Sequence, residues 1–260
     1  MDSKIAVEGI ILVLSCQKHM NTRLKDFRLT NDEYQGWKVV YVIGDFFLDV
    51  PYKLNGNIMF VKTEDSYIHL LKKLVLSIQY LYEIYDIKQG VLRSGDDLIY
   101  NERLLNDFLR FPEKPDYYGY NNFRVSFSNP DTSFLRNTIN DNFMVQYYST
   151  HTEDFENPQH NLRGVDISKY MRRPHVPIMA LGVLFYISNK SCSILVEHMK
   201  RINWNIFHFD TNTASYPYTI EDRAVAFILY SNGIGFEHTD NMYSDHTSNN
   251  VIAIHTNKYK

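Results

Sequence analysis

Short, uninterrupted apolar runs alternate along the chain with longer amphipathic stretches. The runs GIILVLSC (residues 9–16) and WKVVYVIG (residues 37–44) are rich in β-branched residues and end in small ones. Such runs are typical of strands buried on both faces of a parallel sheet. Between them, residues 21–34 place charges at helical spacing, so the pattern predicts a β-α-β unit. The apolar side of that helix would carry Leu24, Phe27 and Leu29.

A long amphipathic helix is predicted over residues 66–85, where apolar side chains recur on one stripe. Ser66 stands where it could cap the start of this helix. The stripe is formed by Leu70, Leu74, Ile78, Leu81 and Tyr85.

The next two elements are a strand and a capped helix. GVLRSGDD (residues 90–97) predicts a strand that ends at two acids, and NERLLNDFLR (residues 101–110) predicts a helix. Asn101 would cap this helix and Pro112 would stop it. Strands that alternate with helices favour an α/β sheet.

Composition narrows the class of protein. The 260 residues are 44% hydrophobic and 15% aromatic, enough for one sizeable core, so we expect a single domain. A net charge of -3 leaves no basic surplus, and we predict no nucleic-acid partner. Two cysteines cannot form a disulfide framework. Because there is no leader sequence and no apolar stretch of roughly 18–20 residues, we expect no membrane span and a cytoplasmic protein.

Asp96 and Asp97 are adjacent carboxylates at the end of a predicted strand, which is where ligands bind in open α/β sheets. Two carboxylates at such a point could share a divalent cation such as Mn²⁺ or Mg²⁺. The structural alternative is a β-turn, since Gly-Asp is common turn chemistry. A polymerase palm also carries Gly-Asp-Asp, but it needs more chain and a basic channel.

Two segments around these acids carry a family resemblance. The first has the pattern Asp-Ser-Tyr followed by Leu and Lys, and the second is a strand that ends in a basic residue, a small residue and acids. The first is formed by Asp65, Ser66, Tyr67, Leu70 and Lys73, and the second by Arg93, Ser94, Gly95, Asp96 and Asp97. Together they resemble the centre of the β-1,3-galactosyltransferase family, which includes the β-1,3-N-acetylglucosaminyltransferases and Fringe.

Further segments follow in the order that this family shows, across about 210 residues. An N-terminal basic stretch precedes the second strand, a Pro-Gly-Tyr-Ser segment comes later, and an acidic pair opens a probable helix over residues 223–230. The matching positions are Arg23, Arg28, Thr30, Pro177, Gly182, Tyr186, Ser188, Glu221, Asp222, Gly233 and Ile234.

The resemblance implies a GT-A type, Rossmann-like mixed sheet flanked by helices, in a single domain over residues 1–260. Residues 1–120 would bind the nucleotide sugar, and residues 121–260 would bind the acceptor and carry the catalytic base. The implied activity is inverting transfer of a sugar, of the galactose or N-acetylglucosamine type, from a UDP-sugar to a glycan or glycoconjugate hydroxyl. Mn²⁺ or Mg²⁺ would stabilise the departing diphosphate. The alternative is an inactive glycan- or nucleotide-binding homologue. Eukaryotic members usually have an N-terminal membrane anchor, which this sequence lacks, so we expect either a bacterial or viral homologue or a sequence trimmed of its anchor.

The metal site implied by the resemblance consists of Asp97, at the last Asp of the family's triplet, and a histidine from near the C-terminus. His255 closes an apolar run, and His246 and His238 compete with it. A histidine in this position is otherwise a surface or hydrogen-bonded residue. Gly95 departs from the family, because it stands where the first Asp of the triplet is expected and removes an oxygen ligand.

The catalytic base implied by the resemblance is Asp222 or its neighbour Glu221. Either could instead be a helix cap or a first-turn acid that the helix dipole favours. The donor would be bound by basic residues, by two acids, by an aromatic ring and by a glycine. These residues are Arg23, Arg28, Asp65, Tyr67, Lys73, Arg93, Asp96, Gly182 and Lys258. Each basic residue could equally form an ion pair or lie on an exposed face, Asp65 could cap a helix, and Tyr67 could simply pack.

The segment over residues 121–173 matches the family least and is rich in polar and aromatic residues, including Tyr147 and Tyr148. Aromatic rings offer flat apolar faces to carbohydrates. We therefore expect loops and acceptor contacts to concentrate there.

Overall fold

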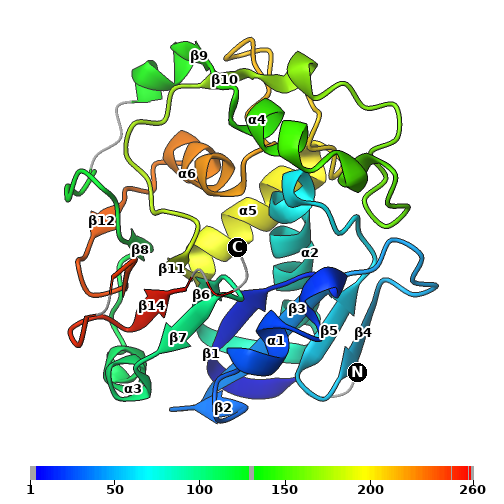
Figure 1. Ribbon diagram of the computed structural model, residues 1–260. Coiled ribbons are helices and arrows are strands. Elements are labelled where there is room, and N and C mark those ends of the chain that lie inside the picture. Colours follow the sequence, from blue (N-terminus) through cyan, green and yellow to red (C-terminus); the bar gives the residue numbers. More distant parts are fainter. Residues whose placement is uncertain (1–3, 129–131, 247, 257, 259–260) are drawn as a thin grey trace.

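The computed structural model describes residues 4–128, 132–246, 248–256 and 258. Within these residues a sheet of nine strands forms the centre of the fold (Figure 1). In spatial order the strands are β12 (Glu237–His238), β8 (Tyr117–Gly119), β11 (Leu184–Ser188), β6 (Tyr85–Ser94), β1 (Ile5–Leu14), β3 (Trp37–Gly44), β5 (Ile58–Val61) and β4 (Tyr52–Asn55), with β2 (Glu33–Tyr34) against β3.

The sheet is mixed. β1 runs parallel to both β3 and β6, and β5 is parallel to β3. β11 is antiparallel to β6 and to β8. The carboxyl ends of β1, β3 and β6 therefore meet at one edge of the sheet, where a ligand is expected.

Strand β1 shows why the core has two layers. Its side chains alternate, so that Ile10, Leu12 and Leu14 join one apolar cluster while Ile11 and Val13 join the other. Both faces are covered, which explains the continuous apolar runs of the central strands.

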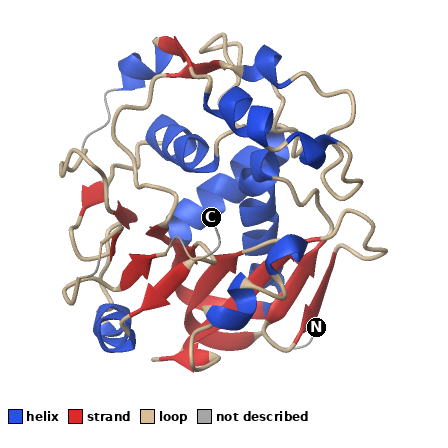
Figure 2. Ribbon diagram, in the orientation of Figure 1, coloured by secondary structure: helices blue, strands red, loops and turns tan. Residues whose placement is uncertain are grey.

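Helices cover the sheet unequally, with most of them above it in Figure 2. α2 (Leu70–Ile84), α5 (Asn189–Arg201) and α6 (Glu221–Ser231) pack together on one face. The opposite cluster receives Leu24 of α1 (Arg23–Asp26) and Leu105 of α3 (Glu102–Arg110). The remaining helices are α4 (Phe143–Thr150) and the 3-10 turns η1 (Gln17–His19), η2 (Tyr67–His69), η3 (Thr132–Arg136), η4 (Thr152–Phe155) and η5 (Ile167–Tyr170).

Two smaller sheets lie beside the central one. β9 (Thr138–Asn140) pairs with β10 (Arg172–Pro174). β14 (Ala253–His255) lies between β7 (Leu98–Tyr100) and β13 (Tyr243–Ser244). This second sheet joins the C-terminal segment to the chain that follows β6 (Figure 1).

Most predicted elements are confirmed, and so is the α/β class with a mixed sheet flanked by helices. The predicted strands correspond to β1, β3 and β6, and the predicted helices to α2, α3 and α6. The Asn101 side chain caps α3 by accepting a hydrogen bond from the Leu104 N–H. No helix in the described part of the chain has the length and apolar character needed to cross a bilayer.

Two local predictions are wrong. Residues 21–34 hold only the four-residue α1, because the next backbone N–H groups bond to distant side chains: Leu29 donates to the Tyr41 hydroxyl and Thr30 donates to Glu102. Leu24 and Leu29 are nevertheless buried, as expected. Ser66 does not cap the helix, since its hydroxyl lies 2.6 Å from Nδ1 of His69.

Candidate functional site

Asp96 lies just beyond the carboxyl end of β6 and is held by three side chains. Its Oδ2 accepts a hydrogen bond from Ser15 Oγ at 2.6 Å and lies 2.7 Å from His19 Nδ1. Its Oδ1 accepts from Arg23 at 3.0 Å. Burial raises the pKa of Asp96, but the hydrogen bonds from His19, Ser15 and Arg23 outweigh it, so that the pKa lies below its ordinary value.

Asp97 is brought next to His255 by the pairing of β14 with β7. His255 stands opposite Leu98, and Asp97 Oδ2 lies 3.3 Å from His255 Nε2. The Thr256 N–H donates to the Asp97 carbonyl at 2.9 Å, and Asp245 Oδ1 lies 2.8 Å from the other ring nitrogen of His255. Burial raises the pKa of Asp97, but His255 and Arg23 outweigh burial, so that the pKa lies below its ordinary value.

The Arg23 guanidinium lies between the two carboxylates, because its NH1 donates to Asp96 at 3.0 Å and to Asp97 at 3.1 Å. This ion pairing offsets the electrostatic repulsion between the two adjacent carboxylates. The Nε of Arg23 is buried and has no hydrogen-bond partner among the described residues. A donor in this state is available to an anionic ligand.

Asp97 and His255 fit a divalent cation as a pair. Their facing donor atoms are 3.3 Å apart, close to the roughly 3.0 Å edge of an octahedron with metal-ligand distances of about 2.1 Å. Within the residues that the structure describes, no group of three or more His, Cys, Asp or Glu side chains could hold a metal. The other ligands would therefore have to come from phosphate oxygens and water.

Gly95 is fitted to its place beside Asp97. A Cβ at this position would lie 3.0 Å from Asp97 Oδ1, so any larger residue would crowd the carboxylate. The Gly95 N–H donates to the Val183 carbonyl at 2.9 Å, which joins the end of β6 to the segment that precedes β11.

Glu221 is committed to a buried ion pair at the start of α6. Its two oxygens accept from Arg93 Nε at 3.1 Å and NH2 at 2.9 Å, and both side chains are only 4% exposed. The third nitrogen of Arg93 donates to the carbonyls of Gly182 and Val183. Burial raises the pKa of Glu221 to about 7, a shift that Arg93 opposes and Asp222 reinforces.

Asp222, in contrast, accepts from backbone N–H groups alone among the described residues. Its Oδ1 is bonded to the Arg223 N–H at 2.8 Å and its Oδ2 to the Gly182 N–H at 3.2 Å. Burial raises its pKa above the ordinary value. Both acids lie in the first turn of α6, whose N-cap is Ile220, so neither is the cap. A Cβ on Gly182 would lie 3.3–3.4 Å from the two carboxylates, which explains why glycine suits this position.

Asp65 and Lys73 are enclosed within the fold. The Lys73 ammonium is 2.8 Å from Asp65 Oδ1 and bonds the Ser15 carbonyl at 2.5 Å, and the two side chains are 1% and 2% exposed. Asp65 also accepts from the N–H groups of Gln17 at 2.7 Å and Gly44 at 2.9 Å. The pair ties the ends of β1 and β3 to α2, and Lys73 has almost no surface to offer a nucleotide.

The other predicted donor contacts are spread along the surface. Arg28 donates to Asn57 at 2.6 Å and lies over the Tyr41 ring, outside the acidic cluster. Lys258 pairs with Asp26 of α1 at 2.6 Å. Tyr67 is 38% exposed, and burial together with the charges of Asp222, Glu221 and Asp97 raises its pKa to about 12.

Sequence reasoning missed several partners of the acids. Ser15, Gln17 and His19 follow β1, and their position after a central strand was the signal that could have found them. Asp245, which holds His255, carries no such signal. His238 lies 3.3 Å from Asp240 instead, and the backbone N–H of His246 donates to the Ser244 hydroxyl.

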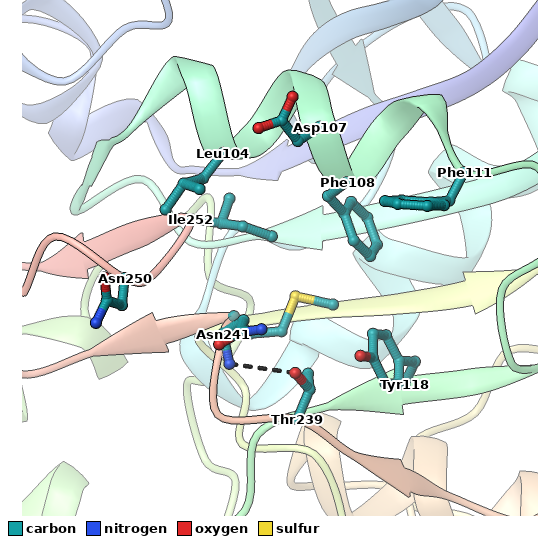
Figure 3. A pocket seen from close by; sticks show the side chains of 10 residues that line it. Leu104, Asp107, Phe108, Phe111, Tyr118, Thr239, Asn241, Asn250 and Ile252 are labelled. Carbon is teal, nitrogen blue, oxygen red and sulfur yellow. Dashed lines mark hydrogen bonds between the residues drawn. The ribbon is translucent and has the colours of Figure 1, made fainter.

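A cavity of about 250 Å³ lies elsewhere, between α3 and the segment after β12 (Figure 3). Phe108, Phe111 and Tyr118 face it together with Asn241 and Ile252. None of the candidate site residues lines this cavity. The acidic cluster is therefore not part of this cavity.

Neither a model of a known protein family nor a curated protein matches the chain. Among solved structures, the chain is similar to the crystal structure of mouse xyloside xylosyltransferase 1 in its apo form. The two share 9% sequence identity over 98% of each chain, with a TM-score of 0.41. A likeness of this degree identifies neither an activity nor a substrate.

Proposed function

We propose that the chain is an inverting glycosyltransferase of GT-A type, which transfers a sugar from a UDP-sugar to a hydroxyl of a carbohydrate or glycoconjugate. The observation that carries the proposal is the combination of two acidic groups near one sheet edge. Asp96 and Asp97 form one with His255, and Asp222 forms the other, partly buried and joined to the first through Gly182–Val183. The order of motifs along the sequence supports the same activity, with galactose or N-acetylglucosamine as the expected sugar.

The donor diphosphate would lie against Asp97, His255 and Arg23. The unpartnered Nε of Arg23 supports this, because it is a buried donor that a phosphate oxygen would satisfy. Asp96, fixed by Ser15 and His19, would orient the ribose or the donor sugar. A divalent cation bound by Asp97 and His255 would neutralise charge on the departing diphosphate.

Asp222 is the better base of the two acids. Both oxygens of Glu221 are engaged by the Arg93 guanidinium, whereas the bonds that the structure describes for Asp222 come from backbone N–H groups. Burial raises the pKa of both acids towards the range in which a carboxylate accepts a proton well, so their partners decide between them. Asp222 would take the acceptor hydroxyl proton while that oxygen bonds to the anomeric carbon and the bond to UDP breaks. One displacement inverts the configuration. Glu221 would position Arg93 and the Gly182 loop.

Calorimetric titration of UDP tests the donor site. We expect binding in the presence of manganese, and at least a tenfold loss with EDTA or in Asp97→Ala. Asp86→Ala, which removes an exposed acid of the same β6 segment, serves as the matched control and should bind as the wild type does. If UDP fails to bind under every condition, the proposal is wrong.

The alternative, an inactive nucleotide-binding homologue, is favoured by one observation. Arg23 already occupies both carboxylates, and the described residues offer a cation only two donors. UDP binding that EDTA does not weaken, together with no sugar transfer, would support it.

A further inference from the structure

A cluster of aromatic rings lies on the surface and is linked through one carboxylate to the helix that carries the predicted base. Tyr67, in η2, stacks on Tyr147 of α4 with centroids 4.6 Å apart, and Phe143 lies 6.1 Å from Tyr67. Tyr147 is covered on its other side by His151, at 4.1 Å. The Tyr67 and Phe143 side chains remain 38% and 43% exposed, so these two rings are the ones that can meet a ligand.

One carboxylate ties this cluster to the helix that carries Asp222. Asp141 Oδ1 accepts a hydrogen bond from the Phe143 N–H at 2.9 Å, which fixes the start of α4. Its Oδ2 lies 3.3 Å from Nε of Arg223, the residue after Asp222, and 3.6 Å from the buried Arg173. Asp141 thereby links the start of α4 to Arg223 in the first turn of α6.

The rings are also fixed in orientation. Tyr148, next to Tyr147, accepts from the Ile68 N–H at 3.2 Å, which links α4 to the turn that carries Tyr67. The stack of Tyr67, Tyr147 and His151 leaves little freedom for the Tyr67 ring to turn away. Rigid aromatic surface that needs no rearrangement is well suited to binding, because little conformational entropy is lost.

We propose that Tyr67 and Phe143 form the platform that binds the acceptor, through the flat apolar face of a pyranose ring. The proposal rests on the proposed function and adds the residues that hold the second substrate. Two exposed rings beside a carboxylate match the two sides of a sugar, whose C–H face is apolar and whose hydroxyls are polar. The Asp141 carboxylate joins Phe143 to Arg223, the neighbour of the proposed base, which favours an acceptor sugar over the uracil base.

Saturation-transfer NMR tests the platform directly. The probes are the methyl β-glycosides of galactose, N-acetylglucosamine and xylose, each added to the full chain with saturating UDP and manganese. We expect at least one probe to receive saturation mainly on the C–H protons of one ring face. Removal of a ring in Phe143→Ala or Tyr67→Ala should weaken binding of that probe about tenfold. Tyr67→Phe, which keeps the ring, should bind the probe as the wild type does.

Phe123→Ala is the matched control, because it removes a 70% exposed phenylalanine from another loop, and it should change nothing. Thermal unfolding of each variant checks that the chain is folded. The platform is overturned if the wild type binds none of the three probes, or if Phe143→Ala and Tyr67→Ala bind them as the wild type does.

Titration of UDP in the same samples separates the two proposals. UDP binding that is unchanged in Phe143→Ala and Tyr67→Ala supports an acceptor platform, whereas its loss would assign the rings to the nucleotide and overturn the inference. If UDP does not bind the wild type but a glycoside still binds through the rings, in UDP-free samples, the transferase proposal fails and a carbohydrate site remains.

Discussion

Replacement of Lys73 by methionine should destabilise the protein strongly, because Lys73 neutralises a buried carboxylate. Methionine fills the space of the lysine stem but leaves Asp65 with two backbone donors, Gln17 and Gly44, and no cation. Removal of one partner from a buried ion pair costs about 3–5 kcal/mol. The Ser15 carbonyl also loses its bond to the ammonium, which is worth about 1 kcal/mol. We therefore expect the free energy of unfolding to fall by about 4 kcal/mol.

Urea unfolding followed by circular dichroism measures this change. Lys88→Met is the matched control, since Lys88 forms an exposed pair with Asp86 that is worth about 1 kcal/mol or less. A double-mutant cycle with Asp65→Asn should give a coupling energy of at least about 1.5 kcal/mol. A Lys73→Met variant within 1 kcal/mol of the wild type, by this order-of-magnitude argument, would refute the buried-pair reasoning.

Three further predictions concern the same edge of the sheet and the helix beside it. Burial lowers the pKa of His19, but its bond to Asp96 and the neighbouring Cys16 outweigh burial and raise the pKa to about 9. The stabilisation of the folded protein by charged His19 is therefore complete below about pH 6.5 and is lost as the pH rises through 9. The stabilisation amounts to roughly 3 kcal/mol at most. Urea unfolding at pH 6.5 and 9 should show a loss of unfolding free energy that His19→Gln lacks, and equal losses in the two proteins would contradict this. Arg23→Met should bind Mn²⁺ about tenfold more tightly in the absence of UDP, because a competing cation is removed, and should bind UDP more weakly. Paramagnetic resonance of free Mn²⁺ measures the first effect and calorimetry the second. Weaker Mn²⁺ binding would show that Arg23 does not compete with the metal. Asn101→Ala should lose about 1 kcal/mol of stability in urea while Asn101→Asp retains it, and an unchanged alanine variant would mean that the cap of α3 contributes nothing.

The framework of the fold could be predicted from the sequence because its signals are local. β3 is buried on both faces, so its sequence is one unbroken apolar run with clear ends. Asn101 indicates where α3 begins, and its side chain caps the helix as expected. Where local signals compete with distant partners, prediction fails. Residues 21–34 have a helical pattern, but the Tyr41 hydroxyl and Glu102 take up the backbone N–H groups that would continue the helix.

The candidate site could be predicted only in part, for a related reason. Position after a strand identified Asp96 and Asp97, and that rule depends on sheet topology alone. The contact between Asp97 and His255 depends on the pairing of β14 with β7 across more than 150 positions of chain, which spacing does not reveal. Lys73 stands in a motif that suggests a nucleotide contact, yet its ammonium forms a buried ion pair with Asp65. No sequence pattern distinguishes a buried lysine from an exposed one on a helix where both neighbours are charged or apolar.

Release of UDP from a panel of UDP-sugars, with a panel of glycoside acceptors, tests the proposed transferase. We expect turnover of at least one pair by the wild type, a loss of about 100-fold or more in Asp222→Asn because a general base is removed, and a product whose anomeric proton reports a β linkage. We also expect the asparagine variant to bind UDP as the wild type does. Equal turnover by Asp222→Asn would contradict the assignment of the base, and UDP binding without turnover of any pair would contradict the transferase itself.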